Sequence, residues 1–303
     1  MLAGTIVAGS LLAPAKAQII LLALQGKSPH CPLSLALKAP AAHVEQETVK
    51  DSFIERLKLG ATEPGFERWD LPASGNVPGR GFWIPAGNRW VLPFNLAEQS
   101  RDIYKISQPE GIHPGDVVLD CGAHVGTFTH FALARGAGKV ISIEPSPRNV
   151  ACLRRNFAKE IAEGRVVVYP KGVWNKDDVM TLEQVDENSA ADTVVMHQPG
   201  AHKGVEAPLT TIDKLVAELG LERVDFIKMD IEGAEAPALE GAAATLKRWK
   251  PRLALASYHK PDDGVVLPAT VDRLTDGYRH RCSSCISDEN GARPEVLLFE
   301  PRP

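Results

Sequence analysis

The residues from 116 to 144 constrain the fold more than any other stretch of this chain. The stretch opens with Val-Val-Leu, which is too short for a helix and suits a buried strand of a parallel sheet. Gly122 and Gly126 then bracket a tight turn, and the stretch closes on the acidic Glu144. The expected elements are a strand over 117–119 ended by Asp120, a helix over 128–134 and a strand over 140–143.

A strand–turn–helix–strand unit of this kind is typical of nucleoside binding. Glycines let a ligand approach the backbone of the turn, and an acid about 20 residues further on takes the ribose hydroxyls. Glu144 stands at that distance, at the end of the second strand. We therefore expect a nucleoside cofactor whose ribose is held by Glu144.

The turn departs from the pattern that binds dinucleotides. That pattern needs glycines where this chain has Asp120 and Val125, because the pyrophosphate must approach the backbone closely. An acid in the turn would repel pyrophosphate but would suit a cationic sulfonium with its amino group. The turn reads D-C-G-A-H-V-G and resembles the D-x-G-x-G-x-G turn of class I S-adenosylmethionine (SAM) methyltransferases. His124 takes the middle glycine place, where FkbM-type methyltransferases often carry another residue.

A second informative stretch runs from 224 to 246. A strand over 225–229 ends at Asp230, and a helix begins near Ala234 and is interrupted at Gly241. The stretch resembles the K-x-D-x-E-G-x-E signature of FkbM-type methyltransferases, with Lys228, Asp230, Glu232, Gly233 and Glu235 in the fixed places. The resemblance covers roughly residues 100–299.

The resemblance implies a Rossmann-like doubly wound α/β sheet of the class I methyltransferase kind, preceded by an N-terminal helical and aromatic extension. It also implies SAM as cofactor and methylation of an oxygen on a sugar or natural-product acceptor. The residues expected to hold the cofactor are Asp120, Gly122, Ala123, His124, Gly126, Thr127, Phe128, Glu144, Pro145, Ser146, Asn149, Gly172, Val173 and Asp230. Gly172 and Val173 are expected near the adenine.

Four ionisable side chains end predicted strands and should meet in one crevice: Asp120, Glu144, Asp230 and His259. Methyl transfer is an in-line displacement, so an alcohol acceptor must be positioned and must also lose its proton. The favoured route is metal-free, with His259 as the base and Asp230 beside it. The other route has Asp230, Glu232 and His259 holding a divalent cation, which requires both acids to face inward. We expect Glu235 to serve only as a helix N-terminal acid.

Composition excludes some partners. At 303 residues, with 44% apolar and 24% charged residues, the chain suits one large soluble α/β domain with extensions. A net charge of −4 gives no basic field for nucleic acid, so we expect a small-molecule acceptor. Five cysteines are an odd count in a large chain, so we expect no disulfide framework. Cys282 and Cys285 have metal-ligand spacing but lack a second pair, which favours ordinary thiols over zinc.

Residues 2–24 are apolar enough to leave three interpretations open. A helix packed on the domain or on a second copy is favoured. A membrane anchor is next, because the length suits a span and the basic residues follow it, which would put the rest of the chain on the cytoplasmic side. A cleaved signal is least favoured, since no basic segment precedes the apolar stretch. We expect a cytoplasmic protein, attached to the membrane only if this segment anchors it.

The expected organisation has three parts: residues 1–40 as hydrophobic segment and linker, 41–110 as a cap, and 111–303 as the methyltransferase domain. Rival functions fit the motifs less well. A nicotinamide dehydrogenase lacks its glycine pattern, and an amino-group methyltransferase typically shows Asn-Pro-Pro-Tyr where this chain has 230–233. A non-catalytic scaffold of the same fold, bound to a partner or membrane, stays an alternative that SAM titration would separate.

Overall fold

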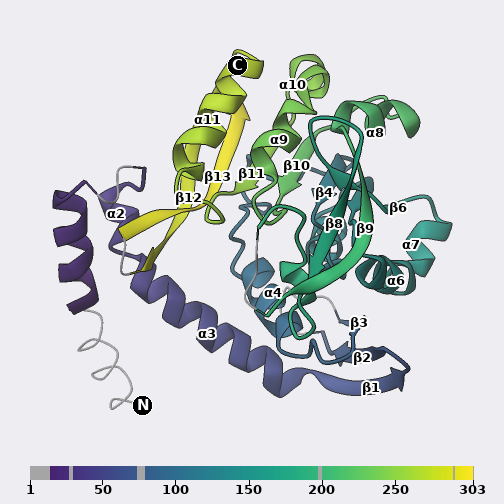
Figure 1. The fold of residues 1–303 in the computed structure, drawn as a ribbon. Coiled ribbons are helices and arrows are strands. Elements are labelled where there is room, and N and C mark those ends of the chain that lie inside the picture. The colour runs from purple at the N-terminus through teal and green to yellow at the C-terminus, as the bar shows by residue number, and fades with distance from the viewer. Residues whose placement is uncertain (1–13, 27–29, 74–78, 197–199, 289–290, 303) are drawn as a thin grey trace.

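A seven-stranded sheet forms the centre of the molecule (Figure 1). The computed structural model describes residues 14–26, 30–73, 79–196, 200–288 and 291–302. The sheet order is β12-β13-β11-β10-β4-β5-β6. The strands are β4 (Val117–Cys121), β5 (Lys139–Ile143), β6 (Val166–Tyr169), β10 (Phe226–Met229), β11 (Arg252–Ala256), β12 (Tyr278–Asp288) and β13 (Gly291–Pro301).

The sheet is parallel from β11 to β6, and β13 runs antiparallel to both of its neighbours. The chain winds outward through β5 and β6 on one side of β4, and through β10 and β11 on the other. The direction of winding therefore reverses between β4 and β10, and in an open α/β sheet ligands bind beyond the strand ends at such a point. The expected doubly wound, Rossmann-like fold is confirmed.

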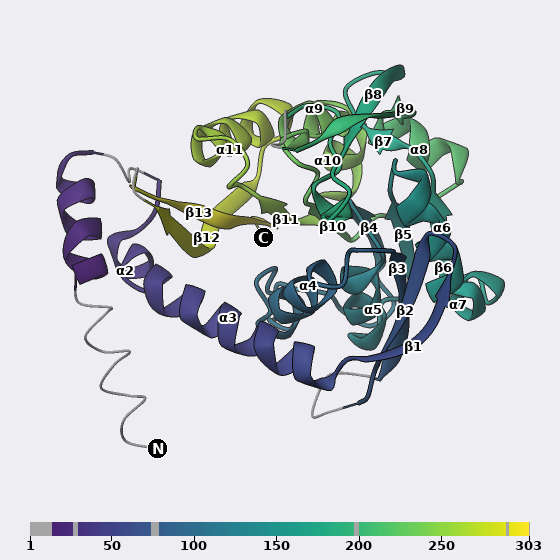
Figure 2. The ribbon, with the colours of Figure 1, turned by 60° about the horizontal axis from the view of Figure 1, so that its bottom comes forward.

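Helices cover both faces of the sheet because side chains of successive strand residues point to opposite faces. Val118 packs with the cluster around Phe128 of α5, whereas its neighbour Leu119 packs with Leu239 of α9. Figure 2 shows α5 and α4 on one face and α9, α10 and α11 on the other. The bounds are α4 (Val91–Ser100), α5 (Thr127–Ala134), α8 (Ile212–Glu218), α9 (Glu235–Glu240), α10 (Ala243–Trp249) and α11 (Asp263–Leu274).

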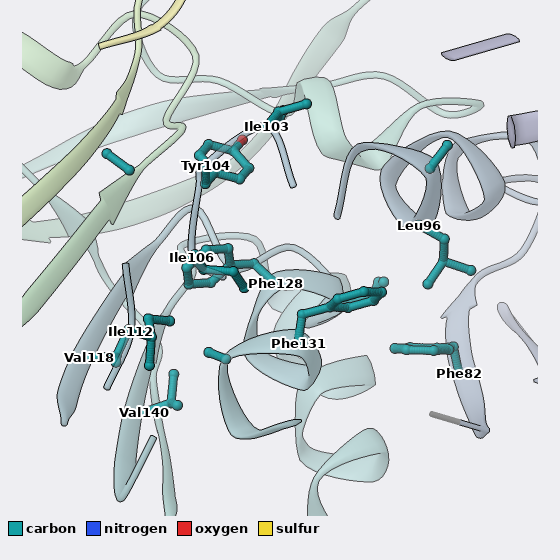
Figure 3. Packing of buried hydrophobic residues seen from close by; sticks show 14 of the residues in the cluster. Phe82, Leu96, Ile103, Tyr104, Ile106, Ile112, Val118, Phe128, Phe131 and Val140 are labelled. Carbon is teal, nitrogen blue, oxygen red and sulfur yellow. The ribbon is translucent and has the colours of Figure 1, made fainter. Parts of the chain in front are cut away.

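The N-terminal cap is built from α3 (Ala39–Arg56), a three-stranded antiparallel sheet and α4. Its strands are β1 (Lys58–Glu63), β2 (Phe66–Leu71) and β3 (Arg80–Pro85). The cap has no separate hydrophobic core among the described residues: Phe82 and Leu96 belong to the same buried cluster as Phe131 and Val140 (Figure 3). The boundary expected near residue 110 stays a prediction, and packing runs continuously across it.

A hairpin insertion follows β6 in the chain. Strands β8 (Asp178–Gln184) and β9 (His202–Thr210) pair antiparallel, and β9 also pairs with β7 (Gly172–Val173). Between them lies the short 3-10 helix η1 (Ser189–Ala191). The remaining helices are α2 (Leu33–Ala36), α6 (Pro147–Asn156) and α7 (Ala158–Ala162).

Residues 1–13, which include the first half of the apolar segment over 2–24, lie outside the described residues. Residues 14–24 are helical, with Ile19 and Leu22 buried and Leu24 exposed. Ile19 packs beside Ala36 and Ala292, so the described part of the segment lies against the domain. Among the residues that the structure describes, every helix is too short or too polar to cross a bilayer. Dimerisation, membrane attachment and cleavage stay predictions.

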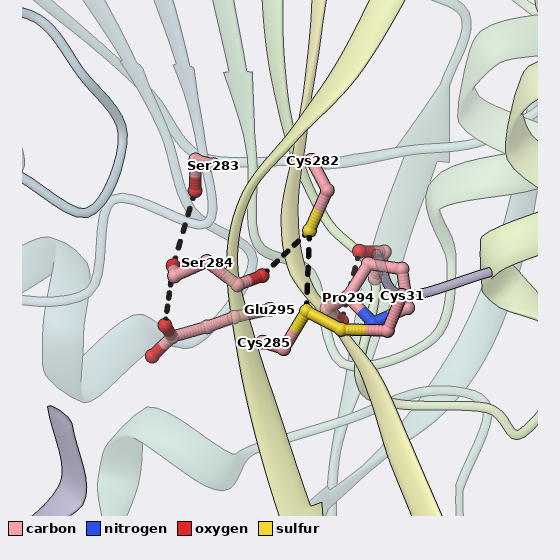
Figure 4. The surroundings of a disulfide bond; sticks show 8 residues. Cys31, Cys282, Ser283, Ser284, Cys285, Pro294 and Glu295 are labelled. Carbon is pink, nitrogen blue, oxygen red and sulfur yellow. Dashed lines mark hydrogen bonds between the residues drawn. A yellow bond between two sulfur atoms is a disulfide. The ribbon is translucent and has the colours of Figure 1, made fainter. Parts of the chain in front are cut away.

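The cysteine pattern differs from the expectation. Cys31 and Cys285 form a disulfide that joins the N-terminal region to β12, with Cα atoms 6.3 Å apart (Figure 4). Cys282 stays a thiol, 3.7 Å from the sulfur of Cys285. The expectation of an ordinary thiol is wrong for Cys285 and holds for Cys282. The sequence could not predict the bond to Cys31, because residues 254 positions apart meet only through the tertiary fold. The linker expected within residues 1–40 is also partly helical, since α2 and the start of α3 lie there.

We predict that Gly126→Ala lowers the free energy of unfolding by about 2–4 kcal/mol. Gly126 has φ of +94°, which costs an L-residue roughly 1–2 kcal/mol, and a Cβ there would overlap the Phe157 ring. Gly164→Ala is the matched control, because Gly164 has φ of +71° but open space around its Cβ position. Urea unfolding measures both, and an equal cost for the two variants would contradict the tight contact with Phe157.

Candidate active site

The turn after β4 is held in a left-handed conformation by three residues. Gly122, His124 and Gly126 all have positive φ, at 77°, 50° and 94°. A Cβ on Gly122 would overlap the carbonyl oxygen of Asp230, and one on Gly126 would overlap Phe157. These glycines are therefore required by packing between parts of the protein, and not only by a ligand as the sequence suggests.

Glu144 lies at the end of β5 and is buried. One carboxylate oxygen accepts the backbone N–H of His124 at 2.8 Å, and the other accepts that of Ser146 at 2.9 Å. Burial raises the pKa of Glu144 to about 7, against the lowering effect of these two donors. The carboxyl group therefore changes its charge near neutral pH.

His124 joins three parts of the structure. Asn95 Nδ2 of α4 lies 3.2 Å from His124 Nδ1, and Ser189 Oγ of η1 lies 2.8 Å from Nε2. Burial, followed by the positive charges of Lys228 and Arg148, lowers the pKa of His124 to about 3, so the ring is neutral. A neutral ring that accepts from Asn95 donates to Ser189, which links the cap, the turn and the hairpin insertion.

Asp120 turns inward, away from the expected ligand. It accepts a hydrogen bond from Thr129 at 2.7 Å, and its other oxygen lies 3.3 Å from Lys228 Nζ. Lys228 also donates to the carbonyl oxygens of Cys121, at 3.2 Å, and Gly122, at 2.9 Å. This buried ion pair joins β4 to β10 and so holds together the strand ends that lead into the two turns.

A small crevice, here called the Glu144 crevice, lies where the first nucleoside contact is expected. Its walls come from the turn, from the end of β5, from β7 and from η1, and it is lined by Gly122, His124, Ile143, Glu144, Pro145, Gly172, Val173, Ser189, Ala190, Asp192, Asp230 and Glu232 among others. Gly172 and Val173 come from the short β7, beside Pro145. The predicted ribose and adenine contacts thus share one crevice.

A larger cavity of about 730 Å³, here called the cap cavity, lies between α3, α4 and the strand ends. Trp90 and Phe94 of the cap line it and keep 56% and 40% of their surface exposed, which makes them accessible to a ligand. Thr127 and Phe128 line it from α5. The two spaces share Gly122, His124, Ala190, Asp230 and Glu232, so they meet at the ends of β4 and β10.

Asp230 occupies that junction. It accepts hydrogen bonds from Tyr104 at 2.5 Å and from Tyr258 at 3.3 Å. Burial would raise its pKa, but Lys228, His259 and the two tyrosines together lower it, so the carboxylate is ionised.

His259 lies behind Asp230 with a side chain only 3% exposed. Burial alone would lower its pKa, but Glu232, Glu235 and Asp230 together raise it well above the ordinary value. A general base must be neutral before it accepts a proton, and it must reach the acceptor. The favoured prediction makes His259 the general base. Its raised pKa and its deep burial both argue against that role.

The structure brings most of the predicted site residues together. Gly122, His124, Glu144, Pro145, Gly172, Val173 and Asp230 line the crevice, and Ala123, Thr127, Phe128 and Glu232 line the cap cavity. Five predicted residues line neither space: Asp120, Gly126, Ser146, Asn149 and His259. Ser146 and Asn149 hold residues that line the crevice. Ser146 Oγ donates to Asp192 at 2.8 Å, and Asn149 Nδ2 donates to the carbonyl oxygen of Ser189 at 3.0 Å.

Three residues have a larger part than the sequence suggested. Glu235 is more than a helix-terminal acid, because its Oε1 lies 3.0 Å from His259 Nδ1 and accepts the N–H of Ile231 at 2.9 Å. Lys228 carries the ion pair with Asp120, and Tyr104 reaches Asp230 across 126 residues of sequence. Lys228 and Glu235 belong to the signature motif, so the motif pointed to them without giving their roles.

The family model described as the methyltransferase FkbM domain matches residues 120–281. The matched span begins at Asp120 and includes the whole K-x-D-x-E-G-x-E motif.

Curated relatives include two methyltransferases. The chain is 26% identical over 157 residues to the 31-O-demethyl-FK506 methyltransferase FkbM of Streptomyces tacrolimicus. This alignment covers 43% of this chain and 60% of that protein. It is 26% identical over 152 residues to the 2-O-methyltransferase NoeI of Sinorhizobium fredii, covering 45% of this chain and 61% of that one. It also matches the AMB antimetabolite synthetase AmbE of Pseudomonas aeruginosa, at 24% identity over 78% of this chain and 13% of AmbE. The chain thus spans about three fifths or less of these relatives.

Among solved structures, a methyltransferase FkbM from Methylobacillus flagellatus superposes with a TM-score of 0.47 and 16% identity. The superposition covers 86% of this chain and 60% of that one.

We predict that Lys228→Met destabilises the fold by about 3–5 kcal/mol, because Asp120 would stay charged and buried without its partner. Adding Asp120→Asn should recover part of that loss, so the two changes should not be additive. Arg165→Met is the matched control: its ion pair with Glu163 is about 40% exposed and should cost less than about 1 kcal/mol. Denaturant unfolding compares them, and equal costs for both single changes would refute the buried pair.

Proposed function

Because this chain belongs to the FkbM methyltransferase family, we propose that it transfers the methyl group of SAM to a hydroxyl group of a sugar or natural-product acceptor. The names of two relatives support oxygen as the target, since both are described as acting at a numbered oxygen.

One observation carries the proposal: two spaces of different character meet at a single point. The Glu144 crevice is narrow and has a buried carboxylate at the end of β5. The cap cavity is wide and has exposed aromatic side chains. A cofactor in the first and an acceptor in the second would face each other beside Asp230, and this is the geometry that a direct transfer between two bound molecules requires.

The residues of the crevice suit SAM. Glu144 offers carboxylate oxygens to the ribose hydroxyls, as the acid of this fold does for a nucleoside. Gly172 and Val173 form the part of the wall expected beside the adenine. The ionised Asp230 at the junction favours a positive charge there, and a sulfonium carries one. When bound, SAM supplies an electrophilic methyl group.

The cap cavity suits a neutral or cationic acceptor with apolar faces. Trp90 and Phe94 present flat, accessible rings that can cover the apolar face of a sugar or a macrocycle. Asp51 and Glu187 line the same space and would repel a polyphosphate. The same acids can accept hydrogen bonds from acceptor hydroxyl groups.

The residues of this chain contribute mainly by positioning. The acceptor oxygen must approach the methyl carbon opposite the sulfur. The new O–C bond forms as the C–S bond breaks, the electron pair of that bond returns to sulfur, and the hydroxyl proton passes to water. The His124 hydrogen bonds fix the turn against α4 and η1 and so fix the two spaces relative to each other.

We expect Glu144→Ala to weaken SAM binding by about 2–3 kcal/mol, because the ribose hydroxyls lose a charged acceptor. Isothermal titration measures the affinity, and thermal unfolding checks that the variant still folds. Glu163→Gln changes an exposed acid and serves as the control. Unchanged SAM affinity in Glu144→Ala would remove the proposed cofactor contact.

SAM affinity should also depend on pH through Glu144. Its pKa is raised to about 7 in the free protein, so it is protonated below that pH and loses its capacity to accept two hydrogen bonds. The dissociation constant should therefore rise about tenfold from pH 8 to pH 6, and it should level off above pH 8. The side chain of Gln in Glu144→Gln cannot titrate, so the pH dependence of SAM affinity in that variant shows the contribution of the ionisable groups of SAM itself. Parallel pH profiles of wild type and Glu144→Gln would contradict this role.

A further inference from the structure

We propose that Asp230, Glu232 and His259 form a binding site for a hard divalent cation, of the Mg²⁺ or Mn²⁺ kind, at the junction of the two spaces. The inference rests on the proposed function and adds a metal to it. One ligand atom from each residue lies within 4.8 Å of the other two. The site in the structure is empty of any ion.

The histidine is the first observation that indicates a ligand. The side chain of His259 is only 3% exposed, and within the described part of the chain its Nε2 makes no hydrogen bond of good geometry. A buried polar group without such a partner lowers the stability of the fold, and a bound ion is one of the standard ways to satisfy it. Nε2 is aimed at two carboxylates, with Asp230 Oδ1 at 3.4 Å and Glu232 Oε1 at 3.6 Å.

The backbone is the second observation. Two residues apart on an extended segment, Asp230 and Glu232 would share one face. Strand β10 ends at Met229, just before them, and Glu232 adopts φ of +52°, a left-handed conformation that is uncommon without glycine. Both residues line the cap cavity and the crevice, so both carboxylates face the same junction. The condition that the sequence left open, that both acids turn inward, is met.

Glu235 supplies the surroundings that a ligating histidine usually has. A histidine that binds a metal through one nitrogen commonly donates the other N–H to a carboxylate, which fixes the ring. Glu235 Oε1 lies 3.0 Å from Nδ1 and is itself held by the N–H of Ile231. Asp263 also approaches the Nδ1 side, but it is 3% exposed and accepts the backbone N–H of Lys260 at 2.7 Å. The open coordination side is therefore that of Nε2.

Donor type and spacing favour a hard cation. Two carboxylates and one imidazole offer oxygen and nitrogen donors, which suit Mg²⁺ or Mn²⁺ better than a thiophilic metal. Neighbouring ligands of an octahedral ion with bonds of about 2.1 Å lie about 3 Å apart, close to the 3.4 Å and 3.6 Å observed without an ion. Three protein ligands on one side leave positions open toward the cap cavity.

A cation at this point explains how an alcohol acceptor loses its proton. The acceptor oxygen would bind the ion in an open position, which lowers the pKa of the hydroxyl group, and its proton passes to solvent water. The oxygen lone pair then forms the bond to the methyl carbon while the C–S bond breaks and its electron pair stays on sulfur. His259 acts as a ligand in this scheme, which agrees with its burial behind Asp230.

The test is direct binding of Mn²⁺ to the full chain, measured by electron paramagnetic resonance with and without S-adenosylhomocysteine. We expect one Mn²⁺ per chain and a nitrogen coupling from an imidazole ligand. Glu232→Gln and His259→Ala should each weaken Mn²⁺ binding at least about tenfold, and His259→Ala should remove the nitrogen coupling. Glu235→Gln, a positioning change, should weaken binding by about 10–100-fold and leave the nitrogen coupling in place.

Matched controls are Glu163→Gln and His43→Ala, which change an exposed acid and an exposed histidine and should leave Mn²⁺ binding unchanged. Binding that is equal in Glu232→Gln and wild type, or a spectrum without nitrogen coupling, would overturn the site. Wild type that binds S-adenosylhomocysteine but no Mn²⁺ would overturn the cation site and leave the proposed function standing. Mn²⁺ bound as expected without any binding of S-adenosylhomocysteine would instead overturn the proposed function.

Discussion

The close approach of the turns after β4 and β10 is the contact on which the rest of the site depends. Gly122 lies against the carbonyl oxygen of Asp230 so tightly that a side chain would not fit. Lys228 of β10 binds the same segment of the chain. It pairs with Asp120 of β4 and donates to the carbonyl oxygens of Cys121 and Gly122. Because the winding of the sheet reverses here, this contact also places the crevice and the cap cavity on either side of Asp230.

Carboxylates outnumber basic side chains in the buried space around this contact. Asp230 and Asp120 face a single buried lysine, while Tyr104 and Tyr258 donate to Asp230. Further acids, including Glu232, surround His259 on the other side. A cationic sulfonium and a divalent cation are both favoured by such an excess of carboxylates. One arrangement thus supports the proposed cofactor and the proposed metal.

The sequence predicted the parts of this arrangement that follow from local pattern. Buried strands, the glycine turn and the strand-end acids Glu144 and Asp230 lie where expected, because the signals for them act within a few residues. It did not predict contacts between distant segments, such as the disulfide of Cys31 or the inward turn of Asp120. It also left the final strands β12 and β13 unassigned, since their pattern alternates weakly.

We propose that the Glu144 crevice holds the cofactor with its sulfur toward Asp230. A crystal structure of the full chain with S-adenosylhomocysteine tests this most directly. We expect both ribose hydroxyls to donate to Glu144 and the adenine to lie beside Gly172 and Val173. The sulfur should face the cap cavity at the junction with Asp230. A ligand bound elsewhere, or bound here with its sulfur turned away from the cap cavity, would contradict it.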